Sequence, residues 1–189
     1  KFKLIKIREN TFNGTSISKI TIPSGVIVIK DDAFANCSKL KTVIFDKNSK
    51  LKQISRGAFE NTSIESIIIP SEVEHIGSSS FLQCSKLKNV TFEPNSKLKY
   101  IGKGAFTTTS ITKIKIPANV NHIDIECFYN SNLQEIEYEN DSKLASIAIN
   151  SFPNSENIKV KIPSNVDFIN TDLSYSQNIS NIVISPNNK

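Results

Sequence analysis

The stretch that decides the fold runs from Phe59 to Phe106 and reads F-ENTSIESIIIP-SEVEHIGSSS-F-LQCSKLKNVTFEPNSKLKYIGKGA-F. The same skeleton occurs 47 residues earlier, from Phe12 to Phe59, and it returns one residue shorter between Phe106 and Phe152. A fixed internal period is typical of repeat arrays, in which each unit packs only against its neighbours. The sequence therefore predicts a repeat architecture, and no catalytic motif stands out above the pattern.

A short apolar pattern, L-x-x-L-x-L, marks each half of this period. Its last two apolar positions flank one outward position, and this alternation is typical of a half-buried β-strand. The pattern returns about every 23 residues, within the 20–29 range of leucine-rich repeats. The seventh copy is irregular because Asn157 holds its first apolar position. The regular copies are Ile17-Ile20-Ile22, Leu40-Val43-Phe45, Ile64-Ile67-Ile69, Leu87-Val90-Phe92, Ile111-Ile114-Ile116, Leu133-Ile136-Tyr138 and Ile179-Ile182-Ile184.

A phenylalanine follows each predicted strand, after a second apolar pair and a small residue. A small side chain beside a ring lets neighbouring backbones approach while the ring fills the interior. We therefore expect the rings to form one continuous buried ladder. Its members are Phe12, Phe34, Phe59, Phe81, Phe106, Phe128 and Phe152, with Leu173 in the same place in the last turn.

Two kinds of turn alternate along the chain. Short turns begin with a proline, which lacks an N–H and ends strand pairing. Long turns, at residues 46–50, 93–97 and 139–143, are rich in Asn, Ser and Asp, whose side chains bond to nearby backbone. We predict a leucine-rich-repeat solenoid of about eight turns of 22–25 residues. Its concave face would carry one parallel sheet, and its convex face would carry short strands or single helical turns.

Residues 1–189 are expected to form a single array that is cut within a repeat at both ends. Leu4, Ile7 and Phe12 match the second half of a repeat, and residues 186–189 match the start of a long turn. Solenoids need polar caps to stay soluble. We therefore predict that this chain is a fragment of a longer protein and that its uncapped ends can pair with another copy.

The charge pattern narrows the classes of partner. The net charge of +5 favours acidic partners through long-range attraction. The lysines are spread among acidic residues and arginine occurs only at Arg8 and Arg56, which argues against a nucleic-acid-binding face. The apolar runs are too short to span a bilayer, and the first ten residues do not resemble a signal peptide.

The cysteines and histidines are candidates for chemistry, and each has a structural alternative. Cys37 and Cys84 hold the same place two turns apart, roughly 10 Å at one strand spacing per turn, which is beyond disulfide reach. Cys127 takes the small-residue position before a phenylalanine, so we interpret all three as small buried residues. His75 and His122 are also two turns apart, so they cannot share a metal. We expect no catalytic residue, no metal and no cofactor.

Six N-x-S/T sequons occur in this chain, which is rich in Asn and Ser. Glycosylation would apply only if the chain is secreted. Asn89 is a poor acceptor because it lies on a predicted strand. The sequons begin at Asn13, Asn36, Asn61, Asn89, Asn140 and Asn178.

The outward residues of the predicted strands are the candidate binding face. Ile44 and Ile68 would touch across adjacent turns as an exposed apolar pair, which suits an anchor for a protein partner. Alternatively, the charged bands keep the sheet soluble and in register, because exposed ion pairs contribute little to binding. The candidate set is Ile44, Ile68, Thr91, Lys113, Lys115, Glu135, Glu137, Lys159 and Lys161.

The repeating unit S-[IL]-x-x-I-x-I-P-x-x-V-x-x-I-x-x-x-A-F-x-x-C-x-x-L resembles the BspA-type leucine-rich repeats. Residues 63–81 with Cys84 and Leu87 show it best, followed by residues 16–34 with Cys37 and Leu40. The resemblance covers nearly the whole chain, and the alternating turns resemble the protist members. That family occurs in surface proteins of host-associated bacteria and of some parasitic protists. The resemblance therefore implies a protein that binds other proteins or mediates adhesion, without catalysis.

Two functional hypotheses follow. The first is a non-catalytic protein–protein interaction module at the cell surface, which adheres to proteins of a host or of neighbouring cells. The alternative is a structural spacer or an intracellular scaffold. Substituting Ile44 and Ile68 with Asp would abolish binding under the first hypothesis and leave it unchanged under the second.

Overall fold

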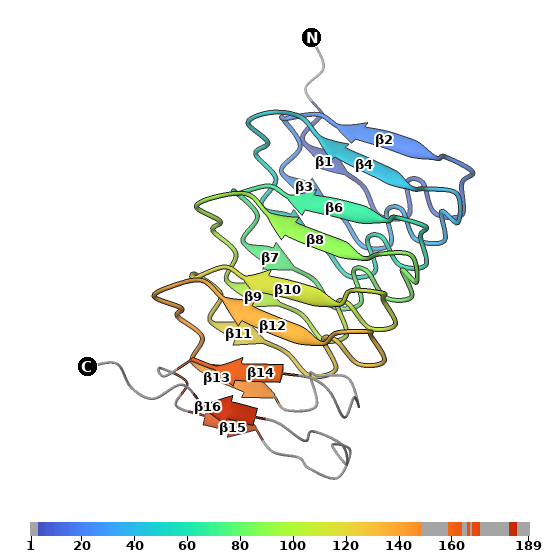
Figure 1. Cartoon of the computed structure of the whole chain (residues 1–189). Helices are drawn as coiled ribbons and strands as arrows, with labels where there is room; N and C mark the ends of the chain where they lie inside the picture. Colours follow the sequence, from blue (N-terminus) through green and yellow to red (C-terminus); the bar gives the residue numbers. More distant parts are fainter. Residues whose placement is uncertain (1–3, 149–158, 164–165, 167, 171–181, 185–189) are drawn as a thin grey trace.

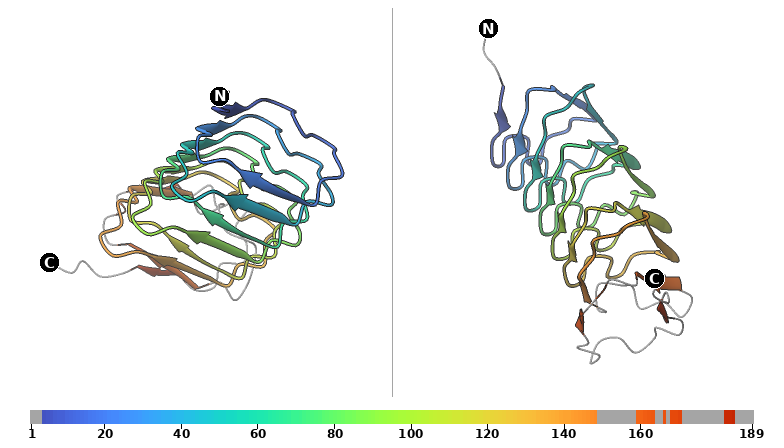
Figure 2. Two further views of the ribbon diagram at one scale, coloured as in Figure 1. Left: turned by 90° about the horizontal axis from the view of Figure 1, so that it is seen from above. Right: turned by 90° about the vertical axis from the view of Figure 1, so that its left-hand side faces the viewer.

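The chain winds into a solenoid in which every turn contributes two parallel strands (Figure 1). This computed structural model describes residues 4–148, 159–163, 166, 168–170 and 182–184. The two strands of a turn belong to different sheets, so the solenoid has two sheet faces joined by turns (Figure 2). No helix long and apolar enough to cross a membrane occurs in these residues. The fold class expected from the repeats is confirmed.

The even-numbered strands are the predicted L-x-x-L-x-L copies. Their side chains alternate between buried and exposed, as in β6, because successive residues of a strand face opposite sides. Six of them fall in the continuous stretch 4–148. They are β2 (Lys19–Ile22), β4 (Thr42–Phe45), β6 (Ser66–Ile69), β8 (Asn89–Phe92), β10 (Lys113–Ile116), β12 (Glu135–Tyr138), β14 (Lys159–Ile162) and β16 (Ile182–Ile184).

The even-numbered strands do not form the single sheet that the sequence predicts. Hydrogen-bonded pairing joins β2 to β4, β6 to β8, and β10 through β12 and β14 to β16. Strands β4 and β6 lie side by side without a ladder between them, and so do β8 and β10. Burial of alternate side chains requires only that the strands stack, so a periodic sequence does not determine whether each pair also exchanges hydrogen bonds.

The odd-numbered strands form the continuous sheet of the molecule. They come from the second apolar pair of each repeat, and all eight join in one parallel sheet. Their inward isoleucines stand in register, as in the pairs Ile7–Ile29 and Ile54–Ile76. The strands are β1 (Lys6–Ile7), β3 (Val28–Ile29), β5 (Gln53–Ile54), β7 (His75–Ile76), β9 (Tyr100–Ile101), β11 (His122–Ile123), β13 (Ser146–Ala148) and β15 (Phe168–Asn170).

The phenylalanine ladder is confirmed. Consecutive rings from Phe12 to Phe128 are stacked, with centroid distances that run from 5.0 to 5.6 Å. The five rings from Phe34 onward have no exposed surface, so they fill the space between the sheets and the turns. Phe152 and Leu173 lie outside the described residues.

Each described ring from Phe12 to Phe128 sits in a turn with left-handed backbone on both sides. The residues two before and two after the ring have positive φ, and around Phe34 they are Asp32 and Asn36. The turn is not helical, because its N–H groups alternate between local bonds and bonds to the next turn of the solenoid. The Phe34 N–H, for example, donates to the Ala58 carbonyl at 2.8 Å. Described residues at these positions therefore contain no helical turn.

The three cysteines are free and buried, as expected. The Cys37 thiol donates to the Phe12 carbonyl at 2.9 Å, and the Cys84 thiol donates to the Phe59 carbonyl at 3.0 Å. Each therefore satisfies a carbonyl of the preceding turn of the solenoid. In other turns a threonine or serine holds this position and donates instead to the phenylalanine carbonyl of its own turn, as Thr109 does to Phe106 at 2.9 Å.

Candidate functional site

The predicted binding face lies on the outward side of the even-numbered strands. Ile44 on β4 and Ile68 on β6 have exposed fractions of 40% and 58%, and Thr91 on β8 is also exposed. Ile44 pairs in register with Thr21, and Ile68 pairs with Thr91. Among the described side chains of the even-numbered strands, these two isoleucines are the exposed large apolar residues.

The two isoleucines flank the interruption between β4 and β6. Each belongs to a separate two-stranded piece, and these pieces lie side by side without a hydrogen-bonded ladder. The strands are adjacent, as the repeat predicts. Direct contact between the two side chains, and a role for them in binding, stay predictions.

The charged bands further along this face are partly confirmed as ion pairs. The Lys113 ammonium lies 2.8 Å from Glu137 and 3.2 Å from Glu135 on the neighbouring strand. The hydrogen bond from Lys113 lowers the pKa of Glu137, and both carboxylates raise the pKa of Lys113. All of these groups face solvent, so the pairs add little to the stability of the fold. Their placement on neighbouring strands favours the observed strand register.

Lys115, Lys159 and Lys161 complete the predicted set. Lys115 is exposed on β10, where its positive charge also favours the ionised form of Glu137. In strand β14, the backbone of Lys159 stands in register with Glu135. The side chains of Lys159 and Lys161 lie outside the described residues.

A second surface, which the sequence reasoning missed, lies where the even-numbered strands turn toward the odd-numbered ones. Glu72 pairs there with Lys52 at 2.6 Å and also with Lys97. Glu74 pairs with Lys99 at 2.7 Å and with Lys52 at 3.4 Å. Hydrogen bonds from Lys52 and then Lys97 lower the pKa of Glu72 to about 2. This network connects three successive turns of the solenoid.

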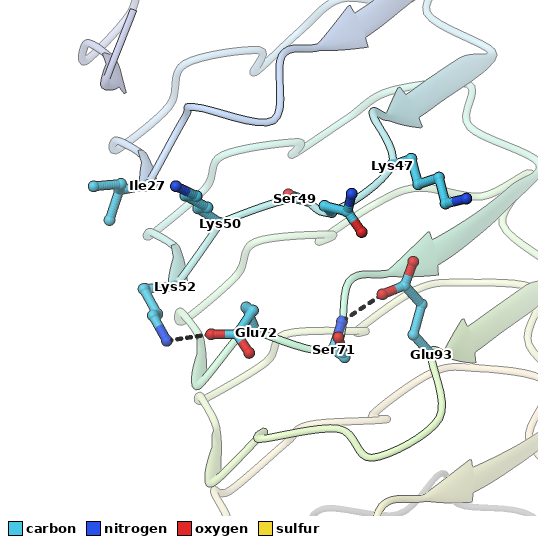
Figure 3. A pocket seen from close by; sticks show the side chains of 9 residues that line it. Ile27, Lys47, Ser49, Lys50, Lys52, Ser71, Glu72 and Glu93 are labelled. Atoms are coloured by element: carbon cyan, nitrogen blue, oxygen red, sulfur yellow. Dashed lines mark hydrogen bonds and ion pairs between the residues drawn. The ribbon is translucent and has the colours of Figure 1, made fainter.

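Two grooves open along this edge, each above a short turn and between two long turns. The first, of about 660 Å³, is seen in Figure 3, where Lys52 meets Glu72 and the Ser71 N–H meets Glu93. It is lined by Ile27, Lys47, Asn48, Ser49, Lys50, Lys52, Ser71, Glu72 and Glu93. The second, of about 360 Å³, is lined by Glu74, Lys97, Lys99, Asn119, Asn121 and Lys143. We call them the first and second edge grooves.

The alternation of turn lengths was the sequence signal for these grooves. A long turn projects beyond a short one, so two long turns enclose a hollow above the short turn between them. The acidic residue that opens a long turn then reaches the short turn, as Glu93 does to the Ser71 N–H at 2.8 Å. Glu139 accepts the Ala118 N–H at 3.0 Å in the next repeat.

The two histidines stand in one column of the odd-numbered sheet with Tyr100 between them. The ring of Tyr100 stacks on His122 at 5.3 Å and is tilted against His75 at 6.4 Å. The Tyr100 hydroxyl donates to Asp124 at 2.6 Å. Burial is the main cause that raises the pKa of Tyr100 to about 12, and the hydrogen bond to this carboxylate adds to it. The tyrosine ring thus separates the imidazoles, and the described residues hold no group of three potential metal ligands.

The coiled repeat, the buried rings and the parallel strand columns define the class of leucine-rich-repeat solenoids. The sequence profile of the BspA type leucine-rich repeat region matches residues 5–134 and 92–189, with 6 copies. The chain therefore belongs to the BspA-type leucine-rich-repeat family. No protein with a curated functional description matches it.

Several solved bacterial proteins match this chain. The pneumococcal vaccine antigen PcpA matches with a TM-score of 0.71 and 23% identity, over 95% of this chain and 56% of that one. A leucine-rich cell surface protein of Faecalibacterium prausnitzii matches with a TM-score of 0.44 and 23% identity, over 91% of this chain and 61% of that one. A leucine-rich-repeat protein of Eubacterium ventriosum matches with a TM-score of 0.47 and 19% identity, over 95% of this chain and 57% of that one. This chain thus spans less than two thirds of each of these proteins.

Proposed function

We propose that this chain is a non-catalytic protein-binding module that acts at a cell surface and attaches to proteins of a host or of neighbouring cells. The observation that carries the proposal is the exposed pair Ile44 and Ile68 on adjacent strands, at 40% and 58% exposure. The outward positions next to them are polar, as at Thr21, Thr42 and Ser66. Apolar side chains within a polar rim suit a site that a protein partner covers.

Family membership supports the surface location. BspA-type repeats occur in surface proteins of host-associated bacteria and parasitic protists, and the fold is shared with a pneumococcal vaccine antigen. A parallel solenoid also presents its outward side chains on a rigid, extended face, which is how repeat proteins bind partners.

The state of the thiols supports a non-catalytic role. Burial raises the pKa of Cys84 to about 11 and raises that of Cys127 well above its ordinary value. A thiol that stays protonated at neutral pH is a poor nucleophile, since the thiolate is the reactive form. The Cys37 and Cys84 thiols are also engaged with backbone carbonyls.

The test is binding of the fluorescently labelled chain to animal epithelial cells, measured by flow cytometry. We expect saturable binding that falls at least about tenfold when Ile44→Asp and Ile68→Asp are combined, because buried interface anchors carry most of the binding energy. Tyr129→Asp is the matched control, since Tyr129 is exposed to a similar degree, 46%, but lies outside the even-numbered strands and outside both edge grooves. Binding that survives the double substitution would exclude this face, and no binding by the wild-type chain would favour the spacer.

A further inference from the structure

The two edge grooves repeat with the period of the double repeat. The last residue of each long turn is a lysine, at Lys50, Lys97 and Lys143, and each groove is lined by at least one of the three. Successive members of this column are two solenoid turns apart, roughly 10 Å at the spacing of hydrogen-bonded strands. The edge therefore presents the same cationic position at regular intervals along the solenoid axis.

Acidic residues only partly neutralise this edge. The lining of the two grooves holds six lysines and three glutamates. The partner position for the lysine column is Gly25, Glu72 and Asn119 in successive double repeats. Lys97 consequently has a carboxylate partner, whereas Lys143 donates to the Asn119 amide oxygen at 2.8 Å.

Lys50 is the least compensated member of the column. Gly25 offers it no side chain, and Lys50 is exposed. Lys47, at the start of the same long turn, is exposed as well and also lines the first edge groove. Among the interactions of the described residues, neither ammonium is paired with a carboxylate.

The lining suits a hydrophilic ligand better than a protein. Its remaining residues are serines and asparagines, and Ile27 is the one apolar residue that lines either groove. Protein interfaces are enriched in aromatic residues and arginine and depleted in lysine, glutamate and serine, the reverse of this composition. Lysine ammonium groups bind anionic oxygens as compact point charges, and amides and hydroxyls can bond to the hydroxyls of a sugar.

We propose that the edge grooves bind a linear anionic polysaccharide that runs along the solenoid axis, with its sulfate or carboxylate groups at the lysine column. The grooves receive successive segments of the polymer, and Asn121 and Ser71 bond to its hydroxyls. This site is separate from the Ile44–Ile68 face, so the chain has one surface for proteins and another for acidic glycans.

The test is titration of the whole chain into fluorescein-labelled dextran sulfate, followed by fluorescence anisotropy at several salt concentrations. Lys50→Gln combined with Lys143→Gln removes one cation from each groove. We expect this variant to bind about tenfold more weakly and to lower the slope of log Kd against log salt concentration by about two. Carboxymethyl dextran separates a preference for carboxylate from one for sulfate, and uncharged dextran should not bind.

The matched control is Lys39→Gln combined with Lys86→Gln, which removes the same charge from exposed lysines outside both grooves. Binding that falls equally in both variants would show general charge attraction and overturn the proposal, as would unchanged binding in the groove variant. Groove-dependent binding of poly-L-glutamate that matches that of the polysaccharides would assign the grooves to acidic peptides and also overturn it. Purified polysaccharide contains no protein, so this outcome is independent of the test on Ile44 and Ile68.

Discussion

At the scale of single residues, backbone conformation explains several asparagines and glycines of the repeat. Residues two before and two after each described phenylalanine have positive φ, including Asn36, Gly57, Asn61 and Gly104. Glycine adopts this region without strain, and asparagine does so more readily than most other residues. The asparagines of the sequons at Asn36 and Asn61 are therefore accounted for by the fold, without glycosylation.

A pair of substitutions at Asn61 separates backbone strain from the loss of its side chain. Both Asn61→Ala and Asn61→Gly remove the 3.0 Å hydrogen bond from the Asn61 amide to Asn36. Only alanine is strained at a φ of 53°, so we expect the alanine variant to be less stable than the glycine variant by about 1 kcal/mol. Urea unfolding followed by circular dichroism measures the difference. Equal stabilities would contradict the conformational explanation.

The phenylalanine ladder predicts a large cost for the loss of one ring. Phe81 is fully buried and stacks at 5.4 Å on both Phe59 and Phe106. We expect Phe81→Ala to lower the free energy of unfolding by about 3–5 kcal/mol, because it removes a large apolar side chain and leaves a cavity. The exposed substitution Thr91→Ala should change it by less than about 0.5 kcal/mol. A small effect of Phe81→Ala in urea unfolding would mean that the ladder is not the core.

The buried thiols predict slow chemical modification. Burial raises the pKa of Cys84 from its ordinary value of 9.0 to about 11, so the thiol stays protonated at pH 8. We expect the three cysteines to react with a thiol reagent only after unfolding in urea, as measured by absorbance. Rapid reaction of the native chain would show that the thiols are accessible.

The raised pKa of Cys84 also makes stability depend on pH. Its contribution to stability is complete below pH 9 and is lost as the pH rises through about 11.

At the scale of elements, the turns supply the charged residues that line the edge grooves. Long turns supply Lys50, Lys97 and Lys143 to the edge, and the short turn between the first two supplies Glu72. Periodicity in the sequence identified both kinds of turn. It indicates where a hollow can form, above a short turn between two long ones, but not whether one does form, because a groove depends on how far one turn projects beyond its neighbour in space.

The ion pairs of the edge predict a low pKa for Glu72. Hydrogen bonds from Lys52 and Lys97 lower it from 4.5 to about 2, so any stability from this carboxylate is present above pH 4.5 and lost as the pH falls through about 2. The pKa of Glu72 is measured by following the ¹³C chemical shift of its side-chain carboxyl group by NMR as the pH is changed. We expect Lys52→Gln to move the pKa back toward 4.5, and the distant Lys88→Gln to leave it unchanged. Titration near 4.5 in the wild-type chain would contradict the ion-pair network.

At the scale of the whole molecule, the sequence predicted which side chains are buried but not how every strand is bonded. The positions of Phe34, Phe81 and Cys84 followed from the repeat, because stacking identical units places equivalent residues in columns. The interruption between β4 and β6 did not follow, since the L-x-x-L-x-L spacing within each copy is the same on both sides of it. The exposure of Ile44 and Ile68 was predicted from alternation, whereas their role in binding needs a partner to test it.

The stacked architecture also separates the two surfaces that we propose for recognition. The outward face of the even-numbered strands holds the isoleucine pair, and the edge holds the lysine column with its two grooves, the first of which is drawn in Figure 3. Because each turn of the solenoid packs on its neighbours, both surfaces keep their spacing along the axis. A module of this kind suits contact with a cell surface that carries both proteins and acidic glycans.

We propose that the array binds its partners outside the cell that produces it. The most direct test is an antibody against this chain, applied to intact and to permeabilised cells of the source organism and read by fluorescence microscopy. We expect staining of intact cells that is removed by protease added from outside. Staining only after permeabilisation would contradict it, and the same faces would then belong to an intracellular scaffold.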